Sequence, residues 1–359
     1  MATGDFFMYR PIAGLGAPNL EALFGAFRAA DHTFANLEGV LTHGRARADK
    51  LLVCRSDPEL APELKRAGID VVTIANNHGM DFGMEGLLDT IEAVQATGVP
   101  VVGGGRDIDE AMRAAALEAG GRKIGFMGLA STLPNGSGAD VARGGVAPVR
   151  VVSRFVIDPI IIDKQPGMAP FVETVVLTGE LERVTEYVQR AKAEVDLLVI
   201  GIHWGVAYGW VAPFQDELAT YQQPLGHALI DAGADAIIGC HSHCLHGVEI
   251  YDGRPIFYSL GNTLFHLHPQ KRARSYPPYL PGSLGPEIEK YGGVVRIVWP
   301  NGVDRPTETE FWPLILDADR EPTLAANADA DAAIGRVEAL SEKFGTRFER
   351  TRDILRVLA

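Results

Sequence analysis

The sequence is poor in cysteine and contains no long hydrophobic run. Three cysteines among 359 residues make an odd number, which excludes a framework of paired disulfides and is typical of a protein from a reducing compartment. No apolar run approaches the roughly 18 residues of a membrane-spanning helix. The first ten residues also lack the charged start and the long apolar stretch of a signal peptide. We therefore expect a cytoplasmic protein without a membrane partner.

Basic residues are scarce relative to acidic ones. The chain has 33 Lys and Arg against 46 Asp and Glu, which gives a formal net charge of −13. This balance argues against a nucleic acid or an anionic membrane as partner, because both require a basic face. Hydrophobic residues make up 47% of the chain, as in a globular protein. A small-molecule or peptide substrate remains the expected partner, and the oligomeric state is left open.

Apolar, β-branched runs alternate with helical patterns along the chain, which is typical of an α/β protein. We expect strands at residues 33–37, 70–75, 99–102, 123–129, 196–202, 236–238, 253–262 and 294–299. We expect helices at residues 20–30, 58–67, 84–97, 108–119, 180–194 and 214–232. Residues 130–178 should form extended loops and a hairpin. Residues 327–358 should form a helical tail packed on the outside, so we divide the chain into a main domain, 1–316, and a tail, 317–359.

Polar side chains follow the ends of several predicted strands. They are Asn36, Glu38, Asn76, Asn77, His78, Asp81, His203, His241, His243 and Asn262. Ligands of open α/β sheets bind at the carboxyl ends of the strands. Carboxylate, amide oxygen and imidazole are ligands of divalent Mn, Fe, Zn, Mg or Ca. The convergence of four such segments predicts a site for one or two divalent ions.

His241 and His243 carry the strongest part of this signal. They stand at alternate positions after an apolar run, so both rings would lie on one face if the strand continued. Ordinary alternatives remain: asparagines cap turns, a histidine can be a hydrogen-bonded core residue, and Cys240 and Cys244 fit small buried positions. A zinc site of Cys240, His243 and Cys244 would lack the second Cys-x-x-Cys half of a structural site.

A long segment, residues 263–293, is rich in Pro, Tyr and cationic residues. Loops of this length are usually functional or disordered. Its cations, which include Arg272 and Arg274, predict a rim over the site that binds a carboxylate or another anion. A solvated insertion without function is the alternative.

Eight motifs together resemble the CapA family. They are Gly4-Asp5, Asn36-Leu-Glu-Gly39, Ala75-Asn-Asn-His78 with Asp81 and Gly83, Gly103-Gly-Gly105, His203-Trp-Gly205, Asp231-Ala-Gly-Ala-Asp235, Gly239-Cys-His-Ser-His243 and Tyr258-Ser-Leu-Gly-Asn262. This family contains the poly-γ-glutamate capsule synthesis proteins of the metallophosphatase-like superfamily, which is related in fold to calcineurin-like phosphoesterases. The resemblance runs from Gly4 to about Phe265. It implies a four-layer αββα sandwich of the metallophosphoesterase type with a metal site at the sheet ends.

The resemblance also implies roles for single residues. Asp5 and His243 would bind a first metal, and Glu38 would stand where the superfamily has its bridging aspartate. The second metal would be bound by Asn77, His203 and His241. The proton donor or base would be His78, oriented by Asp81, and Asp5 is a further catalytic candidate. Substrate contacts are expected from Asn36, Trp204, Asn262, Arg272 and Arg274.

Two departures from the family pattern concern the first metal. The phosphoesterases have a histidine two residues after the first aspartate, but this chain has Phe7. Only four residues precede Asp5, which is few for the strand that presents it, so either a short strand suffices or the role of Asp5 is in doubt. No membrane anchor is recognised in the sequence, and export of a capsule polymer is therefore not expected.

Three functions are compatible with these residues. A metal-dependent hydrolase, in which His78 protonates the leaving group, is favoured because hydrolysis is the commoner use of this architecture. The alternative is a metal-assisted epimerase of a peptide or amino-acid α-carbon, with Asp5 and His243 on opposite sides of the substrate as the proton-transferring groups. The third is a ligand-binding protein that kept only the fold.

Overall fold

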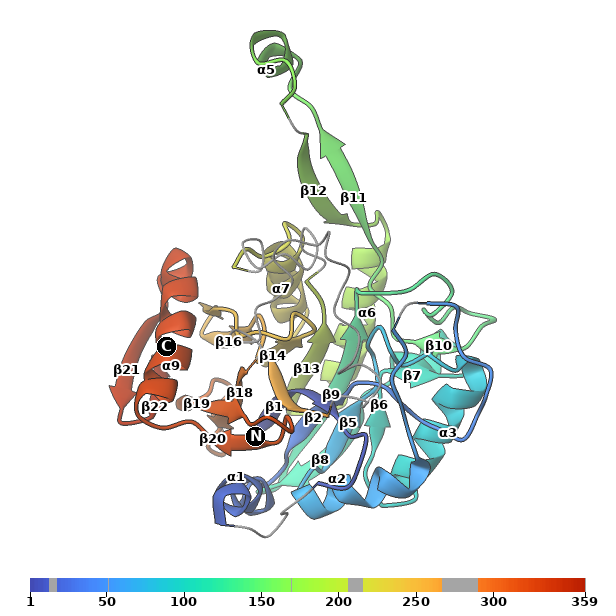
Figure 1. Ribbon diagram of the computed structural model, residues 1–359, viewed down its shortest axis with the longest axis vertical. Coiled ribbons are helices and arrows are strands. Elements are labelled where there is room, and N and C mark those ends of the chain that lie inside the picture. Colours follow the sequence, from blue (N-terminus) through green and yellow to red (C-terminus); the bar gives the residue numbers. More distant parts are fainter. Residues whose placement is uncertain (13–17, 51, 169, 206–215, 267–289, 359) are drawn as a thin grey trace.

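The computed structural model describes residues 1–12, 18–50, 52–168, 170–205, 216–266 and 290–358. Two sheets pack face to face, helices cover their outer sides, and a hairpin projects from the body (Figure 1). Side chains of both sheets share one apolar core, which includes Phe34, Val71, Phe126, Val199 and Phe257. The layers follow the order helix, sheet, sheet, helix, so the predicted α/β sandwich is confirmed.

The larger sheet has ten strands and combines both ends of the chain. Its order is β21-β22-β19-β18-β1-β2-β5-β6, while β17 pairs with β1 and β20 with β19. The strands are β1 (Ala2–Phe7), β2 (Phe34–Leu37), β5 (Val71–Thr73), β6 (Val101–Val102), β17 (Asn262–Phe265), β18 (Tyr291–Val298), β19 (Glu308–Leu316), β20 (Pro322–Leu324), β21 (Arg347–Thr351) and β22 (Ile354–Leu358). Strands β17, β1, β2, β5 and β6 run parallel, so their carboxyl ends share one edge.

The smaller sheet has six strands in the order β15-β16-β14-β13-β9-β8. They are β8 (Ala115–Ala119), β9 (Arg122–Ala130), β13 (Leu197–His203), β14 (Ala236–Cys240), β15 (Val248–Tyr251) and β16 (Arg254–Phe257). The central strands are parallel, and β13 and β14 are buried along their whole length. Burial on both faces explains why these strands are continuous apolar runs in the sequence.

Helices cover both outer faces. The helices of the described residues are α1 (Pro18–Ala29), α2 (Ala61–Ala67), α3 (Gly83–Gln95), α4 (Ile108–Ala111), α5 (Pro159–Lys164), α6 (Glu180–Ala193), α7 (Gln222–Asp231) and α9 (Ala328–Ser341), with 3-10 turns at Pro58–Leu60 and Glu342–Phe344. Of these, α5 covers no sheet and lies at the tip of the projecting hairpin (Figure 1). Helices α1, α2 and α3 pack on the larger sheet through residues such as Phe24, Leu64 and Leu87. Helices α6 and α7 pack on the smaller sheet through Val184 and Leu225.

Three short two-stranded pairs lie outside the two sheets. They are β3 (Val40–Leu41) with β4 (Arg55–Ser56), β7 (Gly104–Gly105) with β10 (Gly145–Val146), and β11 (Val151–Val156) with β12 (Phe171–Val176). The last pair is the hairpin expected within residues 130–178. Among the described residues, no helix combines the length and the apolar character needed to cross a bilayer.

Two predicted helices differ from the structure. The segment 108–119 is helical only in α4, and its second half is the edge strand β8, which pairs antiparallel with β9. Pairing at the sheet edge therefore overrides the helical propensity of its alanines. The predicted helix at 214–232 begins at Gln222, and part of that range lies outside the described residues.

The C-terminal tail contains the predicted helix, but this helix ends at Ser341. Residues 347–358 form the hairpin β21–β22 instead, and β22 extends the larger sheet through β19. Burial alternates along β22, where Leu355 and Val357 face the core between the sheets. The tail thus completes a sheet, and the boundary at residue 316 stays a prediction.

Candidate metal centre

The predicted polar residues meet at the carboxyl ends of strands from both sheets. Asp5 lies within β1, Glu38 follows β2, and the segment from Asn76 to Asp81 follows β5. His203 ends β13 in the other sheet, and His241 and His243 follow the end of β14. The two sheets therefore contribute opposite walls of one cluster.

Asp5 is well placed despite the short segment that precedes it. Strand β1 begins at Ala2 and pairs on both sides, so that Asp5 lies beside Asn36 and Asn262. Its Oδ1 accepts a hydrogen bond from Asn36 Nδ2 at 2.8 Å, and its Oδ2 lies 3.2 Å from the backbone N of His241. A short strand therefore suffices to hold this carboxylate.

Gly4 explains why a glycine precedes Asp5 in the motif. A Cβ at this position would lie 2.0 Å from the carbonyl oxygen of Gly261. The same carbonyl accepts a hydrogen bond of 2.9 Å from the backbone N of Asp5. A side chain on Gly4 would push the backbone of Asp5 away from this partner.

Glu38 is completely buried, and neither carboxylate oxygen has a hydrogen-bond partner among the described residues. Three imidazole nitrogens surround Oε1: His78 Nε2 at 3.8 Å, His243 Nε2 at 3.8 Å and His203 Nε2 at 4.0 Å. Burial, and then the charge of Asp5, raise the pKa of Glu38 well above its ordinary value. A buried carboxylate without hydrogen bonds is costly, and a cation between it and the imidazoles would remove this cost.

A second group of possible ligand atoms lies around His203 Nε2. Asn77 Oδ1 lies 2.8 Å from it, and His241 Nδ1 lies 2.9 Å from it. Ligands at about 2.0–2.2 Å from one ion are separated by roughly 3 Å, so these three atoms fit a shared ion. Burial and neighbouring histidines lower the pKa of His241 to about 3 and that of His203 well below its usual value. Both rings are therefore neutral, as metal binding requires.

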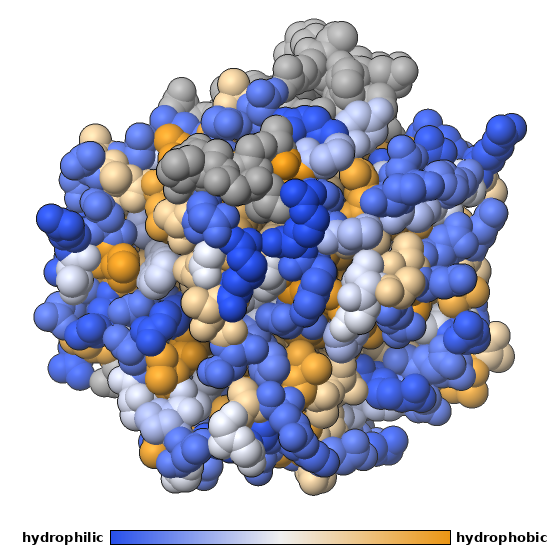
Figure 2. Space-filling model, turned by 90° about the horizontal axis from the view of Figure 1, so that it is seen from below, coloured by the Kyte–Doolittle hydropathy of each residue, from blue (hydrophilic) through white to orange (hydrophobic). Residues whose placement is uncertain are grey.

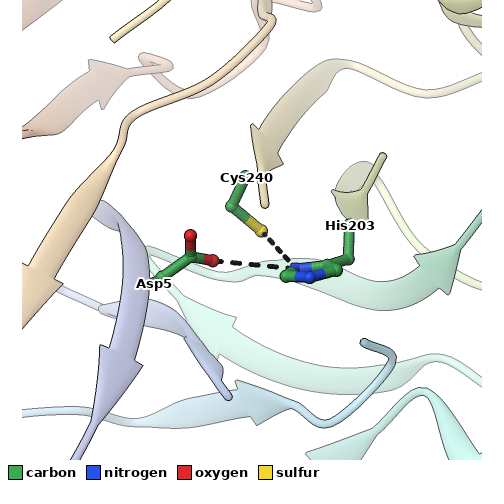
Figure 3. A group of neighbouring side chains, drawn as sticks. All are labelled: Asp5, His203 and Cys240. Carbon is green, nitrogen blue, oxygen red and sulfur yellow. Dashed lines mark hydrogen bonds and ion pairs between the residues drawn. The ribbon is translucent and has the colours of Figure 1, made fainter. Parts of the chain in front are cut away.

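Figure 3 shows how Asp5 from β1 faces His203 and Cys240 from the other sheet. His203 Nδ1 lies 3.7 Å from Asp5 Oδ1 and 3.4 Å from the Sγ of Cys240. Burial raises the pKa of the Cys240 thiol well above its usual value. Cys240 was expected to be a small buried residue; it is buried, and its neutral thiol also supports the ring of His203.

Asp5, Glu38 and His243 form the first predicted site, and their ligand atoms lie close enough to hold an ion. His243 Nδ1 lies 3.2 Å from Asp5 Oδ2. Burial opposes ionisation of Asp5, but the hydrogen bond from His243 and the charges of the neighbouring histidines hold its pKa well below the ordinary value. Phe7 lies beside this group and packs against Phe265, which in turn contacts the ring of His243.

His78 and Asp81 form a dyad, with His78 Nδ1 2.6 Å from Asp81 Oδ2. Sequence reasoning missed Lys50, which forms an ion pair with Asp81. Its Nζ also donates to the backbone oxygen of Asn77 at 2.6 Å and lies 3.4 Å from His78 Nδ1. Lys50 stands in a loop without periodicity or motif, so no sequence signal pointed to it.

The residues expected to bind substrate lie in different parts of the structure. Asn36 bridges Asp5 and His203, and Asn262 Oδ1 lies 2.9 Å from His243 Nδ1, so both support the proposed ligands. Trp204 is only 1% exposed, and its indole N–H donates to the carbonyl of Tyr258. It is therefore buried in the core, and its contact with substrate stays a prediction. Arg272 and Arg274 lie outside the described residues.

A cavity of about 550 Å³ lies at the opposite, amino ends of the strands. Its walls include the starts of β1, β9 and β13 at Ala2, Ile124 and Leu197, together with Trp299. No predicted site residue lines it. Ligands of open α/β sheets bind at the carboxyl ends, so this cavity is separate from the metal centre.

Comparison with known proteins finds relatives over most of the chain. An uncharacterized protein y4sH of Sinorhizobium fredii is 27% identical and covers 97% of this chain and 90% of its own length. The PGA biosynthesis protein CapA of Bacillus subtilis is 29% identical over 67% of this chain, which spans 54% of the relative. A probable polyglutamine synthesis accessory protein of Mycobacterium tuberculosis is 30% identical over 66% of this chain and 56% of the relative.

Among solved structures, a hypothetical protein from Thermus thermophilus superposes with a TM-score of 0.45 and 16% identity, over 87% of this chain and 97% of that one. The family model described as bacterial capsule synthesis protein PGA_cap matches residues 1–267. These residues contain every strand that contributes to the metal centre. The chain therefore belongs to the bacterial capsule synthesis protein family PGA_cap, the family of CapA.

Proposed function

We propose that this protein is a divalent-metal-dependent hydrolase that cleaves a phosphoester or an amide in a substrate bearing a carboxylate. The carrying observation is Glu38, a fully buried carboxylate with no hydrogen-bond partner among the described residues and with three imidazole nitrogens within 4.0 Å. Such a group is suited to bridge cations and is costly without them.

Six residues would hold the metal. Asp5, Glu38 and His243 form one group of close ligand atoms, and Asn77, His203 and His241 form a second. A bound divalent ion would polarise the scissile group and acidify water at the site. Carboxylate, amide and imidazole donors without a thiolate fit Mn, Fe, Zn, Mg or Ca, and the donor set supports one or two ions.

His78 is the proposed proton donor to the leaving group. Its Nδ1 is fixed by Asp81, and its Nε2 points toward Glu38 and hence toward the proposed ions. Lys50 binds Asp81 and the backbone of Asn77, so it fixes the dyad relative to a ligand. The names of two relatives refer to PGA biosynthesis and polyglutamine synthesis, which supports a glutamyl amide as one substrate to test.

The test combines elemental mass spectrometry with a panel of chromogenic substrates. We expect one or two divalent ions per chain and metal-dependent hydrolysis of bis(p-nitrophenyl) phosphate or γ-glutamyl-p-nitroanilide. Glu38→Gln should lose both the metal and the activity. Glu249→Gln is the matched control, because Glu249 is also a buried carboxylate but lies away from the cluster, bonded to Tyr258 and His227. Absence of metal, or equal metal in both variants, would refute the proposal.

Epimerisation at an α-carbon is the second candidate. The apolar Phe7 beside the first site favours it, because it removes a ligand and leaves Asp5 and His243 with fewer competing bonds. The geometry opposes it, because these two side chains are 3.2 Å apart and do not lie on opposite sides of a substrate. Metal binding without hydrolysis, together with uptake of solvent deuterium by a peptide, would favour this candidate over the first.

A further inference from the structure

A projecting arm is the most conspicuous feature outside the metal centre (Figure 1). We use the term arm for residues 151–176, which comprise β11, α5 and β12. Its strands pair from Val151 with Val176 to Val156 with Phe171 and form a sheet of their own. The root is fixed to the body, because the hydroxyl of Thr220 accepts from the backbone N of Thr174 and donates to its carbonyl, both at 2.7 Å.

The outer part of the arm exposes large apolar side chains. Phe155 is 71% exposed and Ile160 is 67% exposed, and the other exposed large apolar residues of the arm are Val156, Ile157, Ile161, Ile162, Met168 and Phe171. Summed over both faces of the hairpin and its tip, these eight side chains expose on the order of 700 Å² if a fully exposed side chain of this size has roughly 150–200 Å². Val156 and Phe171 lie on one face of the hairpin and Phe155 lies on the other, because successive residues of a strand point to opposite faces.

Among the residues that the structure describes, the end of the molecule opposite the arm has no comparable group of exposed apolar residues in the view of Figure 2. Apolar residues there are dispersed among hydrophilic ones on the surface (Figure 2). A two-stranded hairpin is marginally stable alone, and an arm that extends its apolar residues into water gains nothing from its own body. The arm is thus built to be covered by a partner.

The charges of the arm indicate which partner. The arm has two basic residues, Arg154 and Lys164, and three acidic ones, Asp158, Asp163 and Glu173, so its net charge is −1. An anionic lipid surface would require a basic arm.

Arg154 and Glu173 instead form a directly opposed cross-strand pair on the face that also carries Val156 and Phe171. A two-fold axis through this face would place Arg154 opposite the partner subunit's Glu173 and apolar residues opposite apolar residues. The same patch would then be complementary to itself, as a two-fold interface requires. We propose that the protein is a two-fold dimer in which the arm of one subunit docks on the arm of the other.

The first test is the mass of the full chain in solution, measured by sedimentation velocity across a concentration series. We expect a dimer for the unaltered protein and a monomer with unchanged circular dichroism for the double variant Val156→Asp, Phe171→Asp. Val141→Asp is the matched control, because Val141 is 80% exposed and lies outside the arm, and it should remain dimeric. A monomer at all concentrations, or a double variant that stays dimeric, would overturn the proposal.

The second test separates pairing between subunits from stabilisation within one hairpin. Arg154→Glu and Glu173→Arg should each be monomeric, because each places like charges opposite each other across the axis. Mixing the two variants should yield a mixed dimer, because every contact across the axis then joins opposite charges although both hairpins keep a like-charge pair. Failure of the mixture to associate would refute arm-to-arm docking. A chain that is monomeric and pellets with neutral phosphatidylcholine vesicles would show that lipid covers the arm instead.

Discussion

Lys50 shows how much the centre depends on a residue that binds no metal in our assignment. The side chain is 22% exposed, whereas that of its partner Asp81 is 1% exposed. Lys50→Met should leave Asp81 as a buried carboxylate without its cation, which we expect to lower the free energy of unfolding by about 1–3 kcal/mol. It should also lower kcat more than metal content, because the His78–Asp81 dyad loses its support.

Lys65→Met is the control for this variant. Lys65 also pairs with an aspartate, Asp70, at 3.1 Å, but its side chain is 55% exposed. Exposed pairs contribute little, so we expect a change within about 0.5 kcal/mol. Urea denaturation and elemental analysis check both variants. Equal stability losses for Lys50 and Lys65 would contradict the assignment.

His246 should make the protein sensitive to acid. It is buried, and burial, followed by the charges of Arg336 and Lys343, lowers its pKa to about 3. An unfolded chain binds a proton at this residue below about pH 6.5, whereas the folded chain does not. Stability should therefore be complete above that pH and fall as the pH decreases, by about 2–3 kcal/mol at pH 4.5 for this group.

His246→Gln should reduce this acid-induced loss by a similar amount. Urea denaturation at pH 7.0 and pH 4.5 measures the difference. His43→Gln is the control, since His43 lies at the surface with its side chain 65% exposed, and it should keep the pH dependence of the unaltered protein. A His246→Gln variant with the same loss as the unaltered chain would show that other groups control the acid response.

Single residues of the centre were predictable where they followed an apolar strand, as His203 and His241 do. The direction in which each side chain points could not be predicted from the sequence. Trp204 follows His203 directly, and nothing in the sequence shows that it turns into the core, where Tyr258 accepts its N–H. Lys50 reaches the dyad from a loop, and only the folded chain brings it there. The metal-binding roles of the predicted residues stay predictions.

Strand β22 is the element that departs most from the sequence prediction. Its burial alternates, with Leu355 buried at 0% exposure and Ile354 only half-buried. Leu355→Ala should cost about 2–4 kcal/mol, because Leu355 packs between the two sheets. Ile354→Ala should cost less than about 1 kcal/mol. Equal losses measured by urea denaturation would contradict the two-residue period of a strand.

Elements at the sheet edges were the hardest to predict. The central strands β13 and β14 are buried on both faces and are therefore apolar throughout, which identifies them in the sequence. The edge strand β8 and the hairpin β21–β22 are half-exposed and contain good helix formers or charged residues. Pairing with β9 and β19 makes these segments strands, and the local sequence propensity carries no information about this pairing.

At the scale of the whole molecule, the proposed metal would join the two sheets. Asp5, Glu38 and Asn77 lie on or just after strands of the larger sheet, whereas His203 and His241 lie at or just after the ends of strands of the smaller one. An ion that binds only the folded chain stabilises it by about 2.7 kcal/mol at one hundred times its dissociation constant. We therefore expect a chelator to lower the melting temperature by several degrees and added metal to restore it.

Glu38→Gln should abolish this response to metal and chelator, whereas Glu249→Gln should keep it. Differential scanning calorimetry measures the shifts at constant ionic strength. A chelator effect of equal size in both variants would place the stabilising ion outside the cluster around Glu38.

The position of β1 has a consequence for how the protein is made. This strand precedes the other strands of its sheet along the chain, and whereas β2 follows soon after it, the partners on its other side, β17 and β18, begin at Asn262 and Tyr291. At a synthesis rate of about 5–20 residues per second, roughly 13–50 s separate the translation of Asp5 from that of Asn262. On the ribosome, the nascent chain therefore carries an unfinished sheet for most of its synthesis. Until β17 and β18 have been synthesised, incomplete chains should depend on chaperones to keep the open edge of β1 from pairing with a strand of another nascent chain.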